Sequence, residues 1–236
     1  MRAIILAFGL FLAATPALAQ TEQTPAPADS AAPPPGGQTT PDQAAPVPAA
    51  APAVTNPPMT GPKLLISTSM GDITLQLDAQ RAPKSVANVL RYVREKHYDG
   101  TVVYRVVKGF VIQMGSFGAH NKGRGVDPGG VTLESDNGLH NVRGAAALAH
   151  GDDPNSATAD FFIDVGDDTA LDKSDSSVGY AVFGQVSDGM DVVDKINQVA
   201  VGDDGPMKGQ APVDPILIKK ISIIGEPAPK AAAKKK

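Results

Sequence analysis

The sequence predicts a mainly β fold, a closed antiparallel barrel whose ends are capped by helices. Short apolar segments rich in β-branched and aromatic residues recur between residues 63 and 225. Glycine, aspartate, asparagine and serine separate these segments, as expected for turns between strands. Only two segments instead show the spacing of an amphipathic helix. A closed barrel is an arrangement that leaves such short strands without exposed edges.

The individual elements follow from local patterns along the chain. Residues 63–77 are predicted as two strands joined by a turn at Ser69-Met70-Gly71-Asp72. A helix is expected to begin at Pro83, because the fixed φ of proline suits the first helical turn. A second short helix is expected over residues 190–199, with its valines and an isoleucine on one face. A glycine-rich loop is expected over residues 115–130. The remaining strand candidates are residues 102–107, 110–113, 145–149, 161–165, 181–186 and 216–224.

The first residues have the layout of a secretory signal peptide. A positive start, Met1-Arg2, precedes an apolar run over residues 3–14, and Ala17-Leu18-Ala19 fits the small-residue pattern of a cleavage site. We therefore expect cleavage after Ala19 and a periplasmic or secreted protein. The alternative is an uncleaved anchor, although the run is short for spanning a bilayer. No later segment is expected to cross a membrane.

Residues 20–62 are predicted to be a disordered linker. Proline, alanine, threonine and glutamine dominate this stretch, so it cannot bury enough apolar surface to offset its ordering entropy. Its prolines favour an extended, semi-stiff spacer. The folded domain is expected over residues 63–225, and residues 226–236 are expected to form a disordered basic tail.

The composition excludes several classes of function. The formal net charge is −4 and the chain has no cysteine. Nucleic acid is not expected as a partner, because binding phosphates requires a concentrated basic face. The lack of cysteine excludes disulfides, thiolate nucleophiles and cysteine-bound metals. The four histidines lack zinc-site spacing, and no serine-hydrolase elbow is present.

One stretch combines polar and aromatic groups in two adjacent predicted strands. The segment from Tyr104 to Gln113 contains Arg105 and Phe110 as well as the glutamine. Side chains two apart on a strand share a face, so a guanidinium, an aromatic wall and an amide can converge there. The alternative for Arg105 alone is an ordinary surface arginine.

This stretch resembles the signature of the cyclophilins, in which a strand arginine is followed by Gly-Phe-Met-x-Gln. The block from Ala157 to Ile163 resembles the Ser-Gln-Phe-Phe-Ile segment of the family, and the block from Gly179 to Gly184 resembles its strand ending in Val-Phe-Gly. The three blocks occur in the family order, and the likeness is greatest to the bacterial periplasmic branch. The resemblance implies an eight-stranded barrel with two capping helices and a cofactor-free peptidyl-prolyl cis-trans isomerase.

The resemblance also implies roles for individual residues. Arg105 matches the catalytic arginine, with Phe110 and Gln113 beside it as implied catalytic residues. The other implied site residues bind the proline ring or the substrate backbone: Val111, Ala149, His150, Asp160, Phe162, Leu171 and Tyr180. The expected partners are proline-containing polypeptides that are unfolded or exported, and the protein is expected to be a monomer.

Three residues depart from the family pattern. Val111 stands where methionine is usual, and Ala170 stands where a large aromatic residue is common. A more open rim and weak binding of cyclosporin are therefore expected. Asp160 replaces the usual glutamine, and we expect that its carboxylate pairs with Arg105 and competes with substrate.

Two other functions fit the same sequence. The domain can be a binding module, with a cyclophilin shape but little activity, that acts as a chaperone or tether. It can also be a structural protein held away from an envelope layer by residues 20–62. The retained Arg105, Phe110, Gln113 and Phe162 favour the enzyme.

Overall fold

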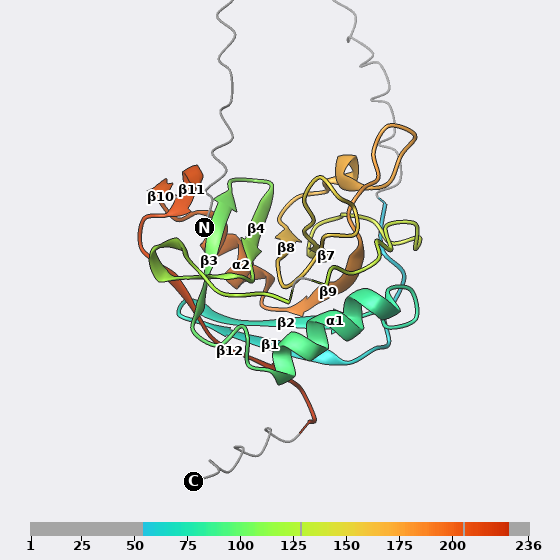
Figure 1. Ribbon diagram of the computed structural model, residues 1–236, viewed down its shortest axis with the longest axis horizontal. Coiled ribbons are helices and arrows are strands. Elements are labelled where there is room, and N and C mark those ends of the chain that lie inside the picture. Colours follow the sequence, from blue (N-terminus) through green and yellow to red (C-terminus); the bar gives the residue numbers. More distant parts are fainter. Residues whose placement is uncertain (1–53, 128, 205, 227–236) are drawn as a thin grey trace, which may run out of the picture. The chain divides into compact units, whose positions relative to one another are not determined.

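The computed structural model describes residues 54–127, 129–204 and 206–226. Its centre is a closed barrel in which each strand pairs with the next in the order β1, β12, β3, β4, β8, β7, β9, β2 and back to β1, and every neighbouring pair is antiparallel (Figure 1). The predicted eight-stranded antiparallel barrel is thus confirmed. The barrel strands are β1 (Lys63–Thr68), β2 (Gly71–Leu77), β3 (Thr101–Val107), β4 (Val111–Met114), β7 (Ala145–Leu148), β8 (Phe161–Asp164), β9 (Val182–Asp188) and β12 (Ile216–Ile223).

The barrel interior is filled by alternate residues of each strand. Leu64 and Ile66 of β1 are fully buried, and so are the residues opposite them on β2, Leu75 and Ile73 respectively. Because successive side chains of a strand point to opposite faces, the intervening residues lie outside the barrel. Two buried rings of this core, those of Phe161 and Phe183, meet edge to face with centroids 5.9 Å apart.

Two helices complete the core. The first, α1 (Pro83–Arg94), begins at the predicted proline, and the second, α2 (Met190–Asn197), ends two residues before its predicted end. The carboxylate of Glu134 accepts hydrogen bonds from the backbone N–H groups of Lys84 and Ser85, at 3.0 and 2.9 Å. These N–H groups have no partner inside the helix, so Glu134 acts as a cap from outside it.

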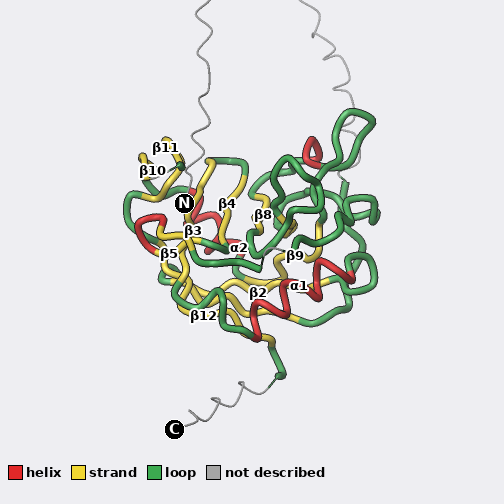
Figure 2. The backbone as a smooth tube through the Cα atoms, viewed as in Figure 1, coloured by secondary structure: helices red, strands yellow, loops and turns green. Residues whose placement is uncertain are grey.

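Two small sheets lie outside the barrel. The predicted glycine-rich loop contains β5 (Phe117–Gly118) and β6 (Lys122–Gly123), with the short helix η1 (Ala119–Asn121) between them. A second hairpin, β10 (Val201–Asp204) and β11 (Met207–Pro212), was not predicted, because its polar and glycine-rich sequence lacks apolar alternation. Long loops also join β6 to β7 and β8 to β9, and the loop from β8 to β9 (Figure 2) contains the short helix η2 (Thr169–Leu171).

The end of the predicted linker contacts the barrel. Gly61 donates a backbone hydrogen bond of 3.0 Å to the carbonyl of Leu77, whose own N–H donates to the carbonyl of Pro62 at 2.9 Å. Residues 54–62 are therefore attached to the folded domain. The predicted signal peptide, most of the linker and nearly all of the basic tail fall outside the described residues. Within residues 54–226 as described, no helix has the length and apolar character needed to cross a membrane.

Candidate active site

A cavity of about 280 Å³ lies on the outer face of the barrel, over strands β3, β4, β8 and β7. The structure brings nine of the ten predicted site residues together in its wall. They are Arg105, Phe110, Val111, Gln113, Ala149, His150, Phe162, Leu171 and Tyr180. The tenth, Asp160, is placed elsewhere.

Strand register lines up the central side chains. Arg105 on β3 is the direct cross-strand partner of Gln113 on β4, which in turn is opposite Phe162 on β8. Directly opposed residues of antiparallel strands have side chains on the same face, so the three form one row across the sheet. The guanidinium is thereby placed at one end of the row and the apolar ring at the other.

A bulge in β3 turns Arg105 towards this face. Val103 pairs with Met114, and Arg105 pairs with the preceding residue Gln113, so Tyr104 is an extra residue on β3. In a regular strand Arg105 would share the inward face of Val103, which belongs to the buried core. The bulge reverses that alternation, and Arg105 faces the cavity instead of the interior.

Two glutamine side chains hold the guanidinium. Nη1 of Arg105 donates to Oε1 of Gln113 at 2.9 Å, and Nε donates to Oε1 of Gln210 at 2.6 Å. An arginine has five N–H donors, so these two contacts fix its plane while the other donors can serve a substrate. Gln210 lies on β11 and was missed by sequence reasoning, because it is 105 positions from Arg105 in an unpredicted hairpin.

The opposite wall of the cavity is apolar and aromatic. The ring of Phe162 meets that of Tyr180 edge to face, with centroids 5.3 Å apart, and Tyr180 stacks on His150 at 4.6 Å. The ring nitrogens of His150 lie 2.7 Å from the carbonyl oxygen of Gly151 and 3.0 Å from that of Gly179. Phe162 and Val111 belong to one buried apolar cluster beneath the cavity. This wall suits a compact apolar ring such as that of proline.

Asp160 does not pair with Arg105, so that expectation is wrong. Oδ1 of Asp160 accepts from the backbone N–H of Ser116 at 2.8 Å, and Oδ2 accepts from its hydroxyl at 2.6 Å. Among the ion pairs of the described residues, none joins Asp160 to Arg105. The aspartate is directed to the turn after β4, where Gly115 has a φ of 147° and a Cβ would lie 2.6 Å from Oδ1. Burial raises the pKa of Asp160.

A buried carboxyl lies behind the cavity. Asp164 is two residues after Phe162 on β8 and directly opposite Val111 on β4, so it shares the outer face with both. Its side chain is fully buried, and neither oxygen has a hydrogen-bond partner among the described residues. Burial, followed by the nearby Asp168 and Asp172, raises the pKa of Asp164 to about 9. The group is therefore neutral at pH 7. In the described part of the chain, no cluster of three or more His, Cys, Asp or Glu side chains is arranged to hold a metal ion.

Comparison with known proteins identifies the family. The sequence model of the protein family "Cyclophilin type peptidyl-prolyl cis-trans isomerase" matches residues 63–223 of this chain. The chain is 44% identical over 165 residues to peptidyl-prolyl cis-trans isomerase A of Dickeya dadantii, covering 70% of this chain and 86% of that protein. It is 42% identical over 160 residues to isomerase B of Escherichia coli, covering 66% and 96%.

The solved structures agree with the sequence relatives. A cyclophilin-type isomerase from Cryptosporidium parvum superimposes with a TM-score of 0.58 at 25% identity, covering 71% of this chain and 100% of that chain. The matched segment contains the whole barrel, both helices and every residue of the cavity wall. This chain therefore belongs to the cyclophilin family of peptidyl-prolyl cis-trans isomerases.

Proposed function

We propose that this cyclophilin accelerates rotation about X-Pro bonds in unfolded or exported polypeptides, with Arg105 polarising the prolyl nitrogen above the apolar cavity. The observation that carries the proposal is the guanidinium of Arg105, held between Gln113 and Gln210 at the edge of that cavity. A cation fixed beside an apolar pocket can act on one bond of a bound proline.

The chemistry requires only a well-placed hydrogen-bond donor. The barrier to rotation, about 18–20 kcal/mol, arises because the nitrogen lone pair is shared with the carbonyl. A donor directed at the prolyl nitrogen competes for that lone pair, most strongly when the bond is twisted. An acceleration of about 10⁴ needs only about 5–6 kcal/mol of preferential transition-state stabilisation. Charge-assisted hydrogen bonds in a partly desolvated site supply energies of this order.

The remaining wall residues receive binding roles in this proposal. Phe110, Val111, Phe162, Leu171 and Tyr180 hold the proline ring while the preceding residue turns, because contacts with the ring do not change during rotation. Gln113 holds the substrate amide as well as the guanidinium, and Ala149 and His150 pair with the substrate backbone. For Asp160 the contact with Ser116 supports a structural role in the turn after β4 instead of substrate binding.

An isomerase assay on a short proline peptide tests the enzyme against the binding module. Arg105→Ala should lower kcat/KM about 100-fold or more, since it removes the charged donor. Arg94→Ala is the matched control, because Arg94 is on the exposed face of α1 and pairs with Glu226. Equal rates for wild type and Arg105→Ala would refute the enzymatic role of Arg105 and favour a binding or tethering function.

Export is also part of the proposal and is supported by the signal-like pattern of residues 1–19. N-terminal sequencing of the protein recovered from its cells should give Gln20 as the first residue. An intact Met1 terminus on protein recovered from the cytoplasm would contradict export. Deleting residues 20–50 tests the alternative of a structural protein held away from an envelope layer. That alternative requires the shortened protein to change its location in the cell.

A further inference from the structure

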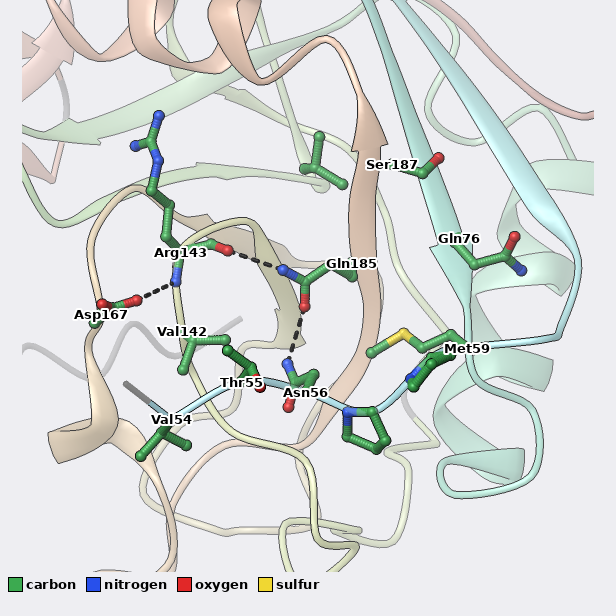
Figure 3. Close-up of a pocket in the computed structure, with 13 residues that line it drawn as sticks. Val54, Thr55, Asn56, Met59, Gln76, Val142, Arg143, Asp167, Gln185 and Ser187 are labelled. Atoms are coloured by element: carbon green, nitrogen blue, oxygen red, sulfur yellow. Dashed lines mark hydrogen bonds between the residues drawn. The ribbon is translucent and has the colours of Figure 1, made fainter. Parts of the chain in front are cut away.

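The last residues of the predicted linker are bound to a loop of the barrel through Asn56. Nδ2 of Asn56 donates to the carbonyl of His140 at 2.9 Å, and Oδ1 accepts from the N–H of His140 at 2.7 Å. Nδ2 also donates to Oε1 of Gln185 on β9 at 3.0 Å, and Gln185 in turn donates to the carbonyl of Arg143 at 2.9 Å (Figure 3). One side chain therefore satisfies both backbone groups of His140, as a neighbouring strand would.

The loop that Asn56 holds is bonded to Asp172. Nδ1 of His140 lies 2.8 Å from Oδ2 of Asp172. The backbone and side-chain N–H groups of Asn141 both donate to Oδ1 of Asp172, at 2.7 and 2.8 Å. Asn141 is fully buried, and its carbonyl also accepts from the N–H of Asp168 at 2.8 Å. Residues 168 and 172 flank η2, so the loop is hydrogen-bonded to the residues at both ends of that short helix.

The helix η2 carries part of the cavity wall. Leu171 is its last residue and lines the cavity, and its carbonyl accepts from the N–H of Tyr180, another wall residue, at 2.9 Å. Met59, three residues after Asn56, packs against the apolar cluster that contains Phe162. Hydrogen bonds and packing thus connect residues 54–59 to the apolar side of the cavity.

We propose that Asn56 is a positioning residue for proline binding, acting through His140, Asn141 and Asp172 to hold Leu171 and Tyr180 in the cavity wall. The inference rests on the proposed function, because it concerns the substrate pocket of that site. Asn56 lies outside residues 63–223, the segment matched by the family model. In this proposal the end of the linker positions the cavity wall as well as attaching the linker to the domain.

The expected effect is on substrate affinity. The apolar wall contacts the proline ring equally before and during rotation, so loosening it weakens ground state and transition state together. Arg105 is held independently by Gln113 and Gln210 and keeps its position. Asn56→Ala in the full chain should therefore raise KM for a proline peptide about threefold to tenfold and leave kcat within about twofold.

Three further variants sharpen the test. Thr55→Ala is the matched control, a truncation in the same segment next to Asn56, and should leave KM unchanged. Asn56→Asp keeps an acceptor for the N–H of His140 but replaces the Nδ2 donor with an oxygen that faces the carbonyl of His140, so its KM should also rise above that of wild type. Asp172→Ala removes the carboxylate that joins His140 and Asn141 to the end of η2. Adding Asn56→Ala to this variant should therefore raise KM little further.

The outcomes separate this inference from the proposed function. An unchanged KM for Asn56→Ala, an effect confined to kcat, an equal effect of Thr55→Ala, or full additivity with Asp172→Ala would overturn the role of Asn56. If Asn56→Ala does not fold, as judged by its melting transition, Asn56→Asp decides by the same KM criterion. A kcat/KM for Arg105→Ala equal to that of wild type would instead refute the proposed function, whatever Asn56 does.

Discussion

Replacing Asp164 with asparagine should stabilise the folded protein at pH 7 and remove part of the pH dependence of its stability. The Asp164 carboxyl is fully buried without a hydrogen-bond partner among the described residues, and burial raises its pKa to about 9. In the unfolded chain the same group has a pKa of about 3.9. Folding at pH 7 therefore requires Asp164 to take up a proton.

The size and sign of the effect follow from this difference in pKa. Between pH 4 and 9 the folded state binds more protons than the unfolded state, so the free energy of unfolding falls as pH rises, by up to about 1.4 kcal/mol per pH unit. The destabilisation is absent below about pH 4 and reaches about 4 kcal/mol at pH 7. An asparagine avoids it but buries an extra N–H donor, which costs about 1–3 kcal/mol. A net gain of about 1–3 kcal/mol at pH 7 remains.

Urea unfolding monitored by circular dichroism suits the measurement, since the chain has no tryptophan. Wild type and Asp164→Asn are compared at pH 5, 7 and 8.5, and the difference between them cancels the other titrating groups. The stability advantage of the variant should grow from pH 5 to pH 8.5. A difference that stays constant over this range would show that Asp164 does not change protonation on folding, and the reasoning from burial would fail.

Three other predictions concern different parts of the molecule. Gln210→Ala should lower kcat about threefold to tenfold in the peptide assay by freeing Nε of Arg105, whereas Lys208→Ala on the same strand should not; equal kcat values would exclude a role for Gln210. Glu134→Ala should lower the free energy of unfolding by about 1–2 kcal/mol, because α1 loses its acceptor, and an unchanged urea midpoint would count against this cap. Cyclosporin should inhibit only weakly because Val111 shortens one wall; inhibition in the nanomolar range would show that this substitution is tolerated.

Local patterns predicted the barrel well because each barrel strand has its own apolar signal. Pro83 fixed the start of α1, and the alternation of the buried Ile73 and Leu75 with polar residues is the pattern that gives β2 its inward face. The placement of Arg105 and Gln113 on one face could also be predicted, because the two residues lie on adjacent strands that each have an apolar signal. Family resemblance, and not periodicity, supplied the number of strands.

Contacts between distant segments could not be predicted in this way. Gln210 reaches Arg105 from a hairpin with no apolar alternation, and Asn56 reaches His140 across 84 positions from a stretch whose composition indicates a linker. The partner of Asp160 was also mispredicted, because a carboxylate and a guanidinium on nearby strands suggest a pair while the chain directs Asp160 to Ser116. Such contacts depend on tertiary placement, for which a single sequence has no local signal.

The bulge at Tyr104 has a consequence for engineering. If β3 kept Tyr104 but paired regularly with β4, Arg105 would share the pleat face of Val103, and its guanidinium would point into the barrel. An unpaired charge there costs several kcal/mol, so a strand paired in this way would remove the guanidinium from the cavity and lower the stability of the fold. Grafting this site onto another barrel therefore requires copying the irregular backbone step together with the arginine.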